Sequence, residues 1–124
     1  DIDLAVQECI LGTLSFNGQR CTALKILFVH RSIAEPFLAK LSQAIGSLKV
    51  GMPWESGVTI TPLPEVGKVD YLSGLIADAE KLGAKVVNPS GGAASGTFFY
   101  PAALYPVSLF VLHRLSPRLE PADV

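Results

Sequence analysis

Charged residues are scarce in this sequence, and apolar residues are abundant. Charged side chains make up 17% of the 124 residues and hydrophobic ones 49%, whereas an average soluble domain is roughly 25% charged. This imbalance favours a chain whose apolar surface is covered by further sequence or by a partner, because large exposed apolar patches usually mark interfaces. The alternative is a self-contained and somewhat apolar domain, for which the length suffices.

Clusters of positive charge and long apolar runs are also missing. The net charge is −1 and the lysines and arginines are dispersed, so we expect no nucleic-acid partner. The longest apolar stretch, residues 98–112, contains Pro101 and Pro106 and is too short to span a bilayer. No secretory signal opens the sequence. We therefore expect neither membrane association nor export.

Cysteine and histidine, which commonly bind metals, occur only twice each. Neither a Cys-x-x-Cys pair nor a histidine-rich spacing is present, so no metal site is expected. Cys9 and Cys21 could pair in principle, but the lack of secretory features favours reduced thiols in a cytoplasmic protein. Cys9 falls on the apolar side of a predicted helix, which indicates a buried structural thiol.

The spacing of apolar residues predicts three helices, over residues 3–14, 32–48 and 68–82. Ser32 is the predicted N-cap of the second helix, and Glu35, three residues later, completes a capping box. Pro36 falls in the first turn of that helix, where proline is tolerated. Gly83 is expected to end the third helix.

Runs of apolar residues predict strands over residues 24–30, 84–88 and 97–101, the first of them buried. Helices and strands therefore alternate, as in an α/β domain. Residues 49–64 form a long connection rich in proline and glycine. The glycine-rich residues 89–96 lack the following Lys-Ser or Lys-Thr of a phosphate-binding loop, and no Gly-x-Gly-x-x-Gly occurs, so they are interpreted as a plain connecting turn.

The stretch with the clearest chemistry is Leu14-Ser15-Phe16-Asn17-Gly18-Gln19-Arg20-Cys21-Thr22-Ala23. Asn17-Gly18 predicts a turn, and Arg20 directly precedes Cys21. A thiol beside a cation, near the positive end of a possible helix, would favour its nucleophilic thiolate form. Cys21 is therefore a candidate nucleophile.

This stretch resembles the active-site cysteine signature of the aldehyde dehydrogenase superfamily. The resemblance covers residues 1–107, because four further segments follow in the family's order and spacing: 49–53, 61–63, 83–87 and 98–102. Gly-Gln-Arg-Cys also occurs in methylmalonate-semialdehyde and aminoadipate-semialdehyde dehydrogenases. The fuller run from Ser15 to Lys25, with residues 52–54 and 61–64, is most similar to the plant subfamily of NADP-dependent, non-phosphorylating glyceraldehyde-3-phosphate dehydrogenases.

The resemblance implies an oxidoreductase that converts a small aldehyde, in this subfamily glyceraldehyde 3-phosphate, to the acid with NADP or NAD. The Cys21 thiolate would attack the aldehyde carbon to give a thiohemiacetal, and oxidation would leave a thioester that water hydrolyses. The Cys21 backbone N–H would help to hold the oxyanion. Arg20 would bind the substrate phosphate, with a local structural salt bridge as the alternative. Gln19 and Thr22 would shape the loop.

The expected fold is a partial aldehyde dehydrogenase catalytic domain of the α/β class, with helices packed on a small, mostly parallel sheet over residues 1–107. Residues 108–124 depart from the family's pattern and are expected to form a divergent, disordered tail, so His113 in that tail receives no role. Because the chain starts at Asp1 rather than at methionine, we expect a fragment, a processed chain or an incomplete gene model.

The general-base glutamate and the nucleotide-binding domain of the family are not found in these residues, so no cofactor-binding residue is assigned. The isolated chain is therefore expected to be inactive by itself, because catalytic groups act as a unit. Full-length members of the family are homo-oligomers. One alternative is a truncated, non-catalytic product that is unstable or that associates with full-length subunits through exposed apolar surface. Another is a fragment of a different semialdehyde dehydrogenase of the same superfamily.

Overall fold

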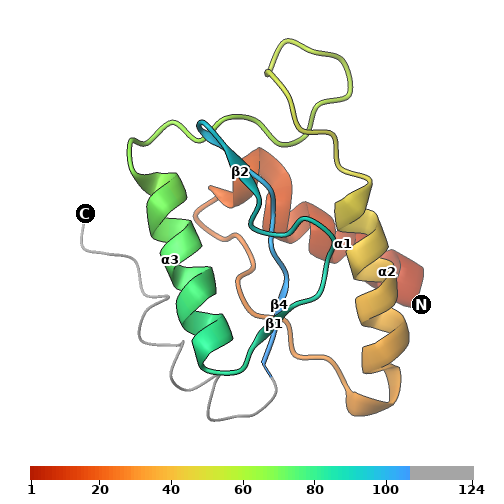
Figure 1. Ribbon diagram of the computed structural model, residues 1–124. Coiled ribbons are helices and arrows are strands. Elements are labelled where there is room, and N and C mark those ends of the chain that lie inside the picture. The colour runs from red at the N-terminus through yellow and green to blue at the C-terminus, as the bar shows by residue number, and fades with distance from the viewer. Residues whose placement is uncertain (107–124) are drawn as a thin grey trace.

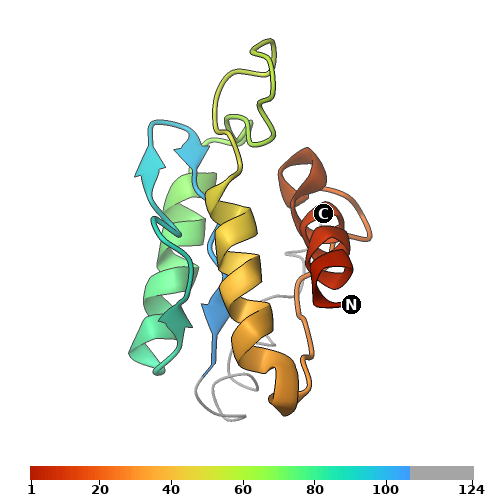
Figure 2. The ribbon, with the colours of Figure 1, turned by 90° about the vertical axis from the view of Figure 1, so that its right-hand side faces the viewer.

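The computed structural model describes residues 1–106, and in it three α-helices precede four short strands (Figure 1). The helices are α1 (Ile2–Leu14), α2 (Ala34–Gly46) and α3 (Lys68–Lys81), with short 3₁₀ helices η1 (Ser15–Gly18) and η2 (Arg31–Ile33). Helix α1 packs against α2 (Figure 2), and Figure 1 shows α3 on the opposite side from α2, with the strands between them. All three predicted helices are confirmed. The predicted tail over residues 108–124, with His113, lies outside the described residues.

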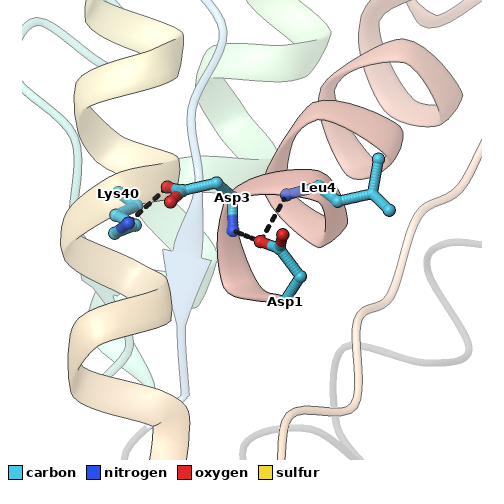
Figure 3. Close-up of polar contacts among 4 residues, drawn as sticks. All are labelled: Asp1, Asp3, Leu4 and Lys40. Carbon is cyan, nitrogen blue, oxygen red and sulfur yellow. Dashed lines mark hydrogen bonds and ion pairs between the residues drawn. The ribbon is translucent and has the colours of Figure 1, made fainter.

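Helix α1 begins at Ile2 because Asp1 caps it. The Asp1 carboxylate accepts hydrogen bonds from the backbone N–H groups of Asp3 and Leu4, at 2.9 and 3.2 Å (Figure 3). These two donors would otherwise have no partner within the helix. Asp3 in turn forms an ion pair with Lys40 of α2, so the first turn of α1 is tied to its neighbour.

The start of α2 differs from the predicted capping box. Ser32 lies in η2, where its backbone N–H donates to the ring nitrogen Nδ1 of His30 at 3.3 Å. Helix α2 then begins at Ala34 without a side-chain cap. The capping-box prediction is wrong because the Ser32 N–H, which Glu35 would have bonded, donates to His30, and Ser32 lies inside η2 rather than at the start of α2. Pro36 lies in the first turn of α2, as predicted.

The main hydrophobic core lies between α1 and α2. Val6 of α1 packs with Phe37, Leu41 and Ile45 of α2, and each of these four side chains is at most 6% exposed. Burial of one such side chain stabilises a fold by about 1.5–3 kcal/mol. The hydroxyl of Tyr100 donates to the Ile45 carbonyl oxygen at 3.0 Å. This core fixes α1, and with it the chain that follows Leu14, against α2.

Residues 24–30 run extended but form no strand with any described residue. Leu27 and Val29 pack against the main core, whereas Ile26 is 40% and Phe28 87% exposed. The prediction of a buried strand is wrong because a strand needs a hydrogen-bonded neighbour, and residues 1–106 supply none here. One side of this segment therefore remains an apolar surface.

Four two-residue strands form two antiparallel pairs: β1 (Lys85–Val86) with β4 (Leu104–Tyr105), and β2 (Ala94–Ser95) with β3 (Phe98–Phe99). The predicted strands over 84–88 and 97–101 are thus present but shorter. The α/β class is confirmed, whereas the mostly parallel sheet is wrong for residues 1–106. The turn at residues 96–97 is too short for a parallel crossover, so β2 and β3 must run in opposite directions. Within residues 1–106, parallel pairing is limited to an isolated bridge between Val50 and Ile60.

Helix α3 ends at Lys81, and Gly83 stops it from just beyond the C-cap, as predicted. Gly83 has a φ of 93°, which a residue with a Cβ adopts only at a cost. Its N–H donates to the Glu80 carbonyl at 2.9 Å, and the Ala84 N–H donates to the Ala79 carbonyl at 3.0 Å, the pair of bonds that defines a Schellman motif. Ala79 and Ala84 are 0% and 5% exposed and form a second, small core. The turn therefore brings β1 directly against α3.

The side chain of Asn88 replaces backbone pairing just beyond β1. It is 4% exposed, and its Oδ1 accepts from the Ala103 N–H at 2.7 Å while its Nδ2 donates to the Pro101 carbonyl at 2.8 Å. A buried amide is tolerated because both ends are hydrogen-bonded. Asn88 therefore continues the contact between β1 and the chain before β4 where the ladder itself stops.

Candidate active site

The loop that carries Cys21 begins with an unusual backbone turn at the end of α1. Phe16, Asn17 and Gly18 have φ values of 53°, 57° and 71°, so three consecutive residues adopt the left-handed conformation. Glycine does so freely and asparagine with little cost, but an aromatic residue is strained there. The Asn17-Gly18 turn is confirmed, and the structure extends it to Phe16.

The side chain of Asn17 ties this turn to a segment 44 residues away. Its Nδ2 donates to the Thr61 carbonyl oxygen at 3.0 Å and to Thr61 Oγ1 at 2.9 Å, and its Oδ1 accepts from the Thr61 N–H at 3.0 Å. The amide thus pairs with the Thr61 backbone as a neighbouring strand would. We call these three bonds the Asn17–Thr61 clamp.

The far side of the loop is fixed to α1 and to the turn. The backbone N–H of Leu24 donates to the Gly12 carbonyl at 3.0 Å, and Nζ of Lys25 donates to the Gly18 carbonyl at 2.8 Å. A further bond from the Ala23 N–H to the Arg20 carbonyl, at 3.0 Å, closes the turn that contains Cys21. Cys21 therefore lies between two anchored ends.

The thiol of Cys21 is free and exposed to solvent. The helix that the sequence suggested after it is absent, because residues 19–22 form turns and an extended segment follows. The expectation of a helix dipole acting on this thiol is therefore wrong. Arg20 is the cation that remains beside it in the sequence. Gln19 and Thr22 are also exposed.

The guanidinium of Arg20 stacks on an aromatic ring. Its Cζ lies 4.7 Å from the centroid of the Phe16 ring, within the range of a cation–π contact. The ion pairs formed among residues 1–106 are Asp3–Lys40 and Glu65–Lys68. Arg20 therefore forms no salt bridge with a carboxylate in the part of the chain that the structure describes, so the alternative of a structural salt bridge has no support there.

Cys9 is the second free thiol and lies in a different environment. It packs against the main core, as predicted. Burial raises the pKa of the Cys9 thiol, and the neighbouring Glu8 carboxylate adds to this effect. Cys9 is thus held in its unreactive thiol form, in keeping with a structural role.

The sequence pattern missed two residues that contact this loop or its side chains, Phe16 and Thr61. Phe16 reads as one more apolar residue after a helix, and Thr61 as part of a proline-rich connection. The clamp joins residues distant in the sequence, so no local pattern reports it. The Asn17-Gly18 pair predicted the turn. The positive φ of Phe16 could not be predicted, because an aromatic residue rarely adopts that conformation.

The glycine-rich loop packs against a helix. Residues 89–93 lead into the β2–β3 hairpin, and a Cβ on Gly92 would lie 2.7 Å from Cδ1 of Ile76 in α3. This close approach accounts for a glycine at position 92 without a bound phosphate. Over residues 1–106, no group of three potential metal ligands gathers, and no helix is long and apolar enough to cross a membrane.

Comparison with known proteins gives a consistent result. The family model described as the aldehyde dehydrogenase family matches residues 1–109. The NADP-dependent glyceraldehyde-3-phosphate dehydrogenase of Streptococcus equinus is 45% identical over 87 residues, which is 70% of this chain and 18% of that protein. The enzyme of the same name from the plant Apium graveolens is 37% identical over 84 residues, 68% of this chain and 17% of that protein.

Solved structures agree with the sequence relatives. The succinate-semialdehyde dehydrogenase of Burkholderia pseudomallei has a TM-score of 0.78 at 37% identity, over 87% of this chain and 23% of that one. The NADP-dependent glyceraldehyde-3-phosphate dehydrogenase of Bacillus halodurans, in complex with NADP, has a TM-score of 0.76 at 33% identity, over 84% and 21%. The chain therefore spans about a fifth of the length of each of these four proteins.

Proposed function

This chain belongs to the aldehyde dehydrogenase family, an enzyme family of oxidoreductases, and from that premise we propose that its gene product oxidises a small aldehyde with Cys21 as the nucleophile. The observation that carries the proposal is the loop itself. A free, exposed thiol lies between two anchored ends, the Asn17–Thr61 clamp and the Lys25–Gly18 bond. A fixed loop presents a nucleophile in one geometry, which lowers the entropic cost of attack.

In the proposed reaction, Sγ of Cys21 forms a bond to the aldehyde carbon and the carbonyl oxygen takes up negative charge. The backbone N–H of Cys21 is the donor that we assign to this oxyanion. Oxidation of the thiohemiacetal leaves a thioester on Cys21, and water releases the acid. NADP, which appears in the names of the relatives, would accept the two electrons. We assign no residue of this chain to its binding.

The substrate that we propose is glyceraldehyde 3-phosphate. The relatives of that name support it, and so does Arg20, whose planar guanidinium suits a phosphate group and which has no carboxylate partner among residues 1–106. The likeness to a succinate-semialdehyde dehydrogenase supports the competing choice of a semialdehyde. A carboxylate at the far end of such a substrate would meet the same guanidinium.

NADPH formation by the complete gene product, followed by absorbance with glyceraldehyde 3-phosphate and with succinate semialdehyde, tests the proposal. Cys21→Ser should abolish turnover because a hydroxyl is a far weaker nucleophile at neutral pH. Cys9→Ala is the matched control and should retain turnover, since Cys9 packs in the core. Turnover that persists in Cys21→Ser would refute the role of this thiol.

A second candidate function is association with other subunits. Leu4, Leu11 and Phe28 are 56%, 60% and 87% exposed, an unusual amount of large apolar surface for residues of helix α1 and the segment that follows its loop. On this hypothesis the chain is a non-catalytic partner that binds to dehydrogenase subunits through that surface. Its test is the state of association, which does not depend on catalysis.

A further inference from the structure

We propose that Phe16 is a positioning residue that makes the Cys21 loop selective for anionic electrophiles, by holding in a fixed orientation the guanidinium of Arg20, the residue directly before Cys21. The proposal rests on the function proposed above for Cys21 and Arg20, and it assigns a role to a residue outside that machinery. The ligand class is a small molecule that carries both an electrophilic carbon and a phosphate or carboxylate group.

The first argument is that Phe16 is strained without an evident packing reason. Its φ of 53° and ψ of 45° lie in the left-handed region, which costs free energy for any residue with a Cβ. Its side chain is 73% exposed, so burial of the ring does not offset that cost. Strained residues of this kind concentrate at functional sites, where the conformation serves a purpose.

The second argument is where the strained backbone places the ring. The Phe16 ring lies beneath the Arg20 guanidinium, 4.7 Å from Cζ to the centroid. The Asn17–Thr61 clamp holds the turn from the next residue along the chain, so the backbone that carries the ring is fixed. The left-handed backbone of Phe16, the Asn17–Thr61 clamp and the ring contact therefore all help to position the Arg20 side chain.

The third argument concerns what remains free on Arg20. Stacking uses one face of the planar guanidinium and leaves its N–H edges available for two parallel hydrogen bonds to an anion. No carboxylate among residues 1–106 pairs with it. An arginine side chain loses much rotamer freedom on binding a ligand, and holding it in advance on a ring lowers that entropic cost.

Alkylation of Cys21 by iodoacetate and by iodoacetamide measures this selectivity directly. In both reactions the sulfur forms a bond to the CH₂ carbon and iodide leaves, but only iodoacetate is an anion. We take the ratio of the two rate constants at Cys21, read by peptide mass spectrometry on the complete chain in the Cys9→Ala background. Thiolate reactivity cancels in this ratio, so it reports recognition of the negative charge.

Phe16→Leu keeps an apolar Cβ-bearing side chain but removes the aromatic face, and it should lower the ratio about two- to five-fold, which matches the strength of an exposed cation–π contact. Phe16→Tyr should restore the ratio. Phe16→Gly relieves the strain, so it should lower the ratio without lowering the unfolding midpoint. Arg20→Leu should lower the ratio at least as far, and adding Phe16→Leu to it should have no further effect.

An unchanged ratio in Phe16→Leu, together with a lowered ratio in Arg20→Leu, would overturn the role of Phe16 and leave that of Arg20 intact. A lower unfolding midpoint in Phe16→Gly, in step with the ratio, would reduce Phe16 to a structural residue. The alkylation ratio needs no catalytic turnover. A gene product that fails to oxidise aldehydes but shows the expected ratios would therefore reject the proposed reaction and keep the inference about Phe16.

Discussion

The side-chain amide of Asn17 makes three hydrogen bonds, all of them to Thr61. Two of the three engage the Thr61 backbone, which is partly buried at this point. A buried backbone group that loses its partner bears the full cost of desolvation. At the scale of single residues, the cysteine loop therefore depends on one amide more than on any property of Cys21.

Asn17→Gly should lower the free energy of unfolding by about 1–3 kcal/mol, because two partly buried backbone groups of Thr61 lose their partners. Glycine tolerates a φ of 57°, so the loss reports the amide and not backbone strain. Urea denaturation followed by circular dichroism measures it. Gln43→Ala removes an exposed amide from α2 and is the control. Equal stability of the two variants would show that the clamp contributes nothing.

At the scale of elements, the two ends of α3 are built differently. The N-cap is Gly67, without a side-chain cap, whereas the C-terminal end closes in the Schellman motif at Gly83 and packs Ala79 against Ala84. The C-terminal end of α3 is thus the better-defined end, and it places β1.

Two glycines associated with this helix should respond to alanine with opposite signs. Gly83→Ala should lower the free energy of unfolding by about 1 kcal/mol, because a Cβ is strained at a φ of 93°. Gly74, inside α3, has no atom within 4 Å of where a Cβ would stand. Gly74→Ala should therefore raise stability by about 0.5–1 kcal/mol. Unfolding midpoints measured side by side test the pair, and a loss in both variants would contradict it.

The sequence predicted elements well where the cause is local. The three helices and the turn at Gly83 follow from spacings within a few residues, and the structure has them. The strand over residues 24–30 failed because its formation depends on a partner strand, which a single run of apolar residues cannot report. The capping box failed because His30, just before the pattern, competed for the Ser32 N–H.

The residues of the candidate site were likewise only partly predictable from the sequence. Cys21 was identified as a candidate nucleophile from its neighbouring residues, and the resemblance added its reaction and the role of Arg20; these chemical roles stay predictions. Phe16 and Thr61 went unnoticed because their contacts depend on a left-handed backbone and on a contact 44 residues away.

At the scale of the whole molecule, the apolar surplus of the sequence appears on the surface. The main core contains four buried side chains, while Leu4, Leu11 and Phe28 remain more than half exposed. Exposed apolar side chains in this number favour association, because burying them releases ordered water.

We expect the purified chain to associate as its concentration rises, and Phe28→Lys to reduce that association, since it places a charge on the most exposed of these three side chains. Sedimentation velocity over a concentration series measures the effect. Trp54→Lys is the control, because Trp54 is 77% exposed but lies in the connection between α2 and α3. A chain that stays monomeric throughout would exclude this association.

The clamp should also affect the rate at which Asn17 deamidates. Asn17 precedes Gly18, and such pairs lose ammonia when the glycine nitrogen attacks the side-chain carbonyl carbon, which leaves aspartate or isoaspartate. In the closed loop that amide is held on Thr61, so we expect slow deamidation in buffer and faster deamidation in urea, read from the mass of the peptide that contains Asn17. Equal rates would show no protection. Each event would replace the Nδ2 donor by a carboxylate facing the Thr61 carbonyl, so a single lost ammonia would permanently release one of the two anchored ends of the loop around Cys21.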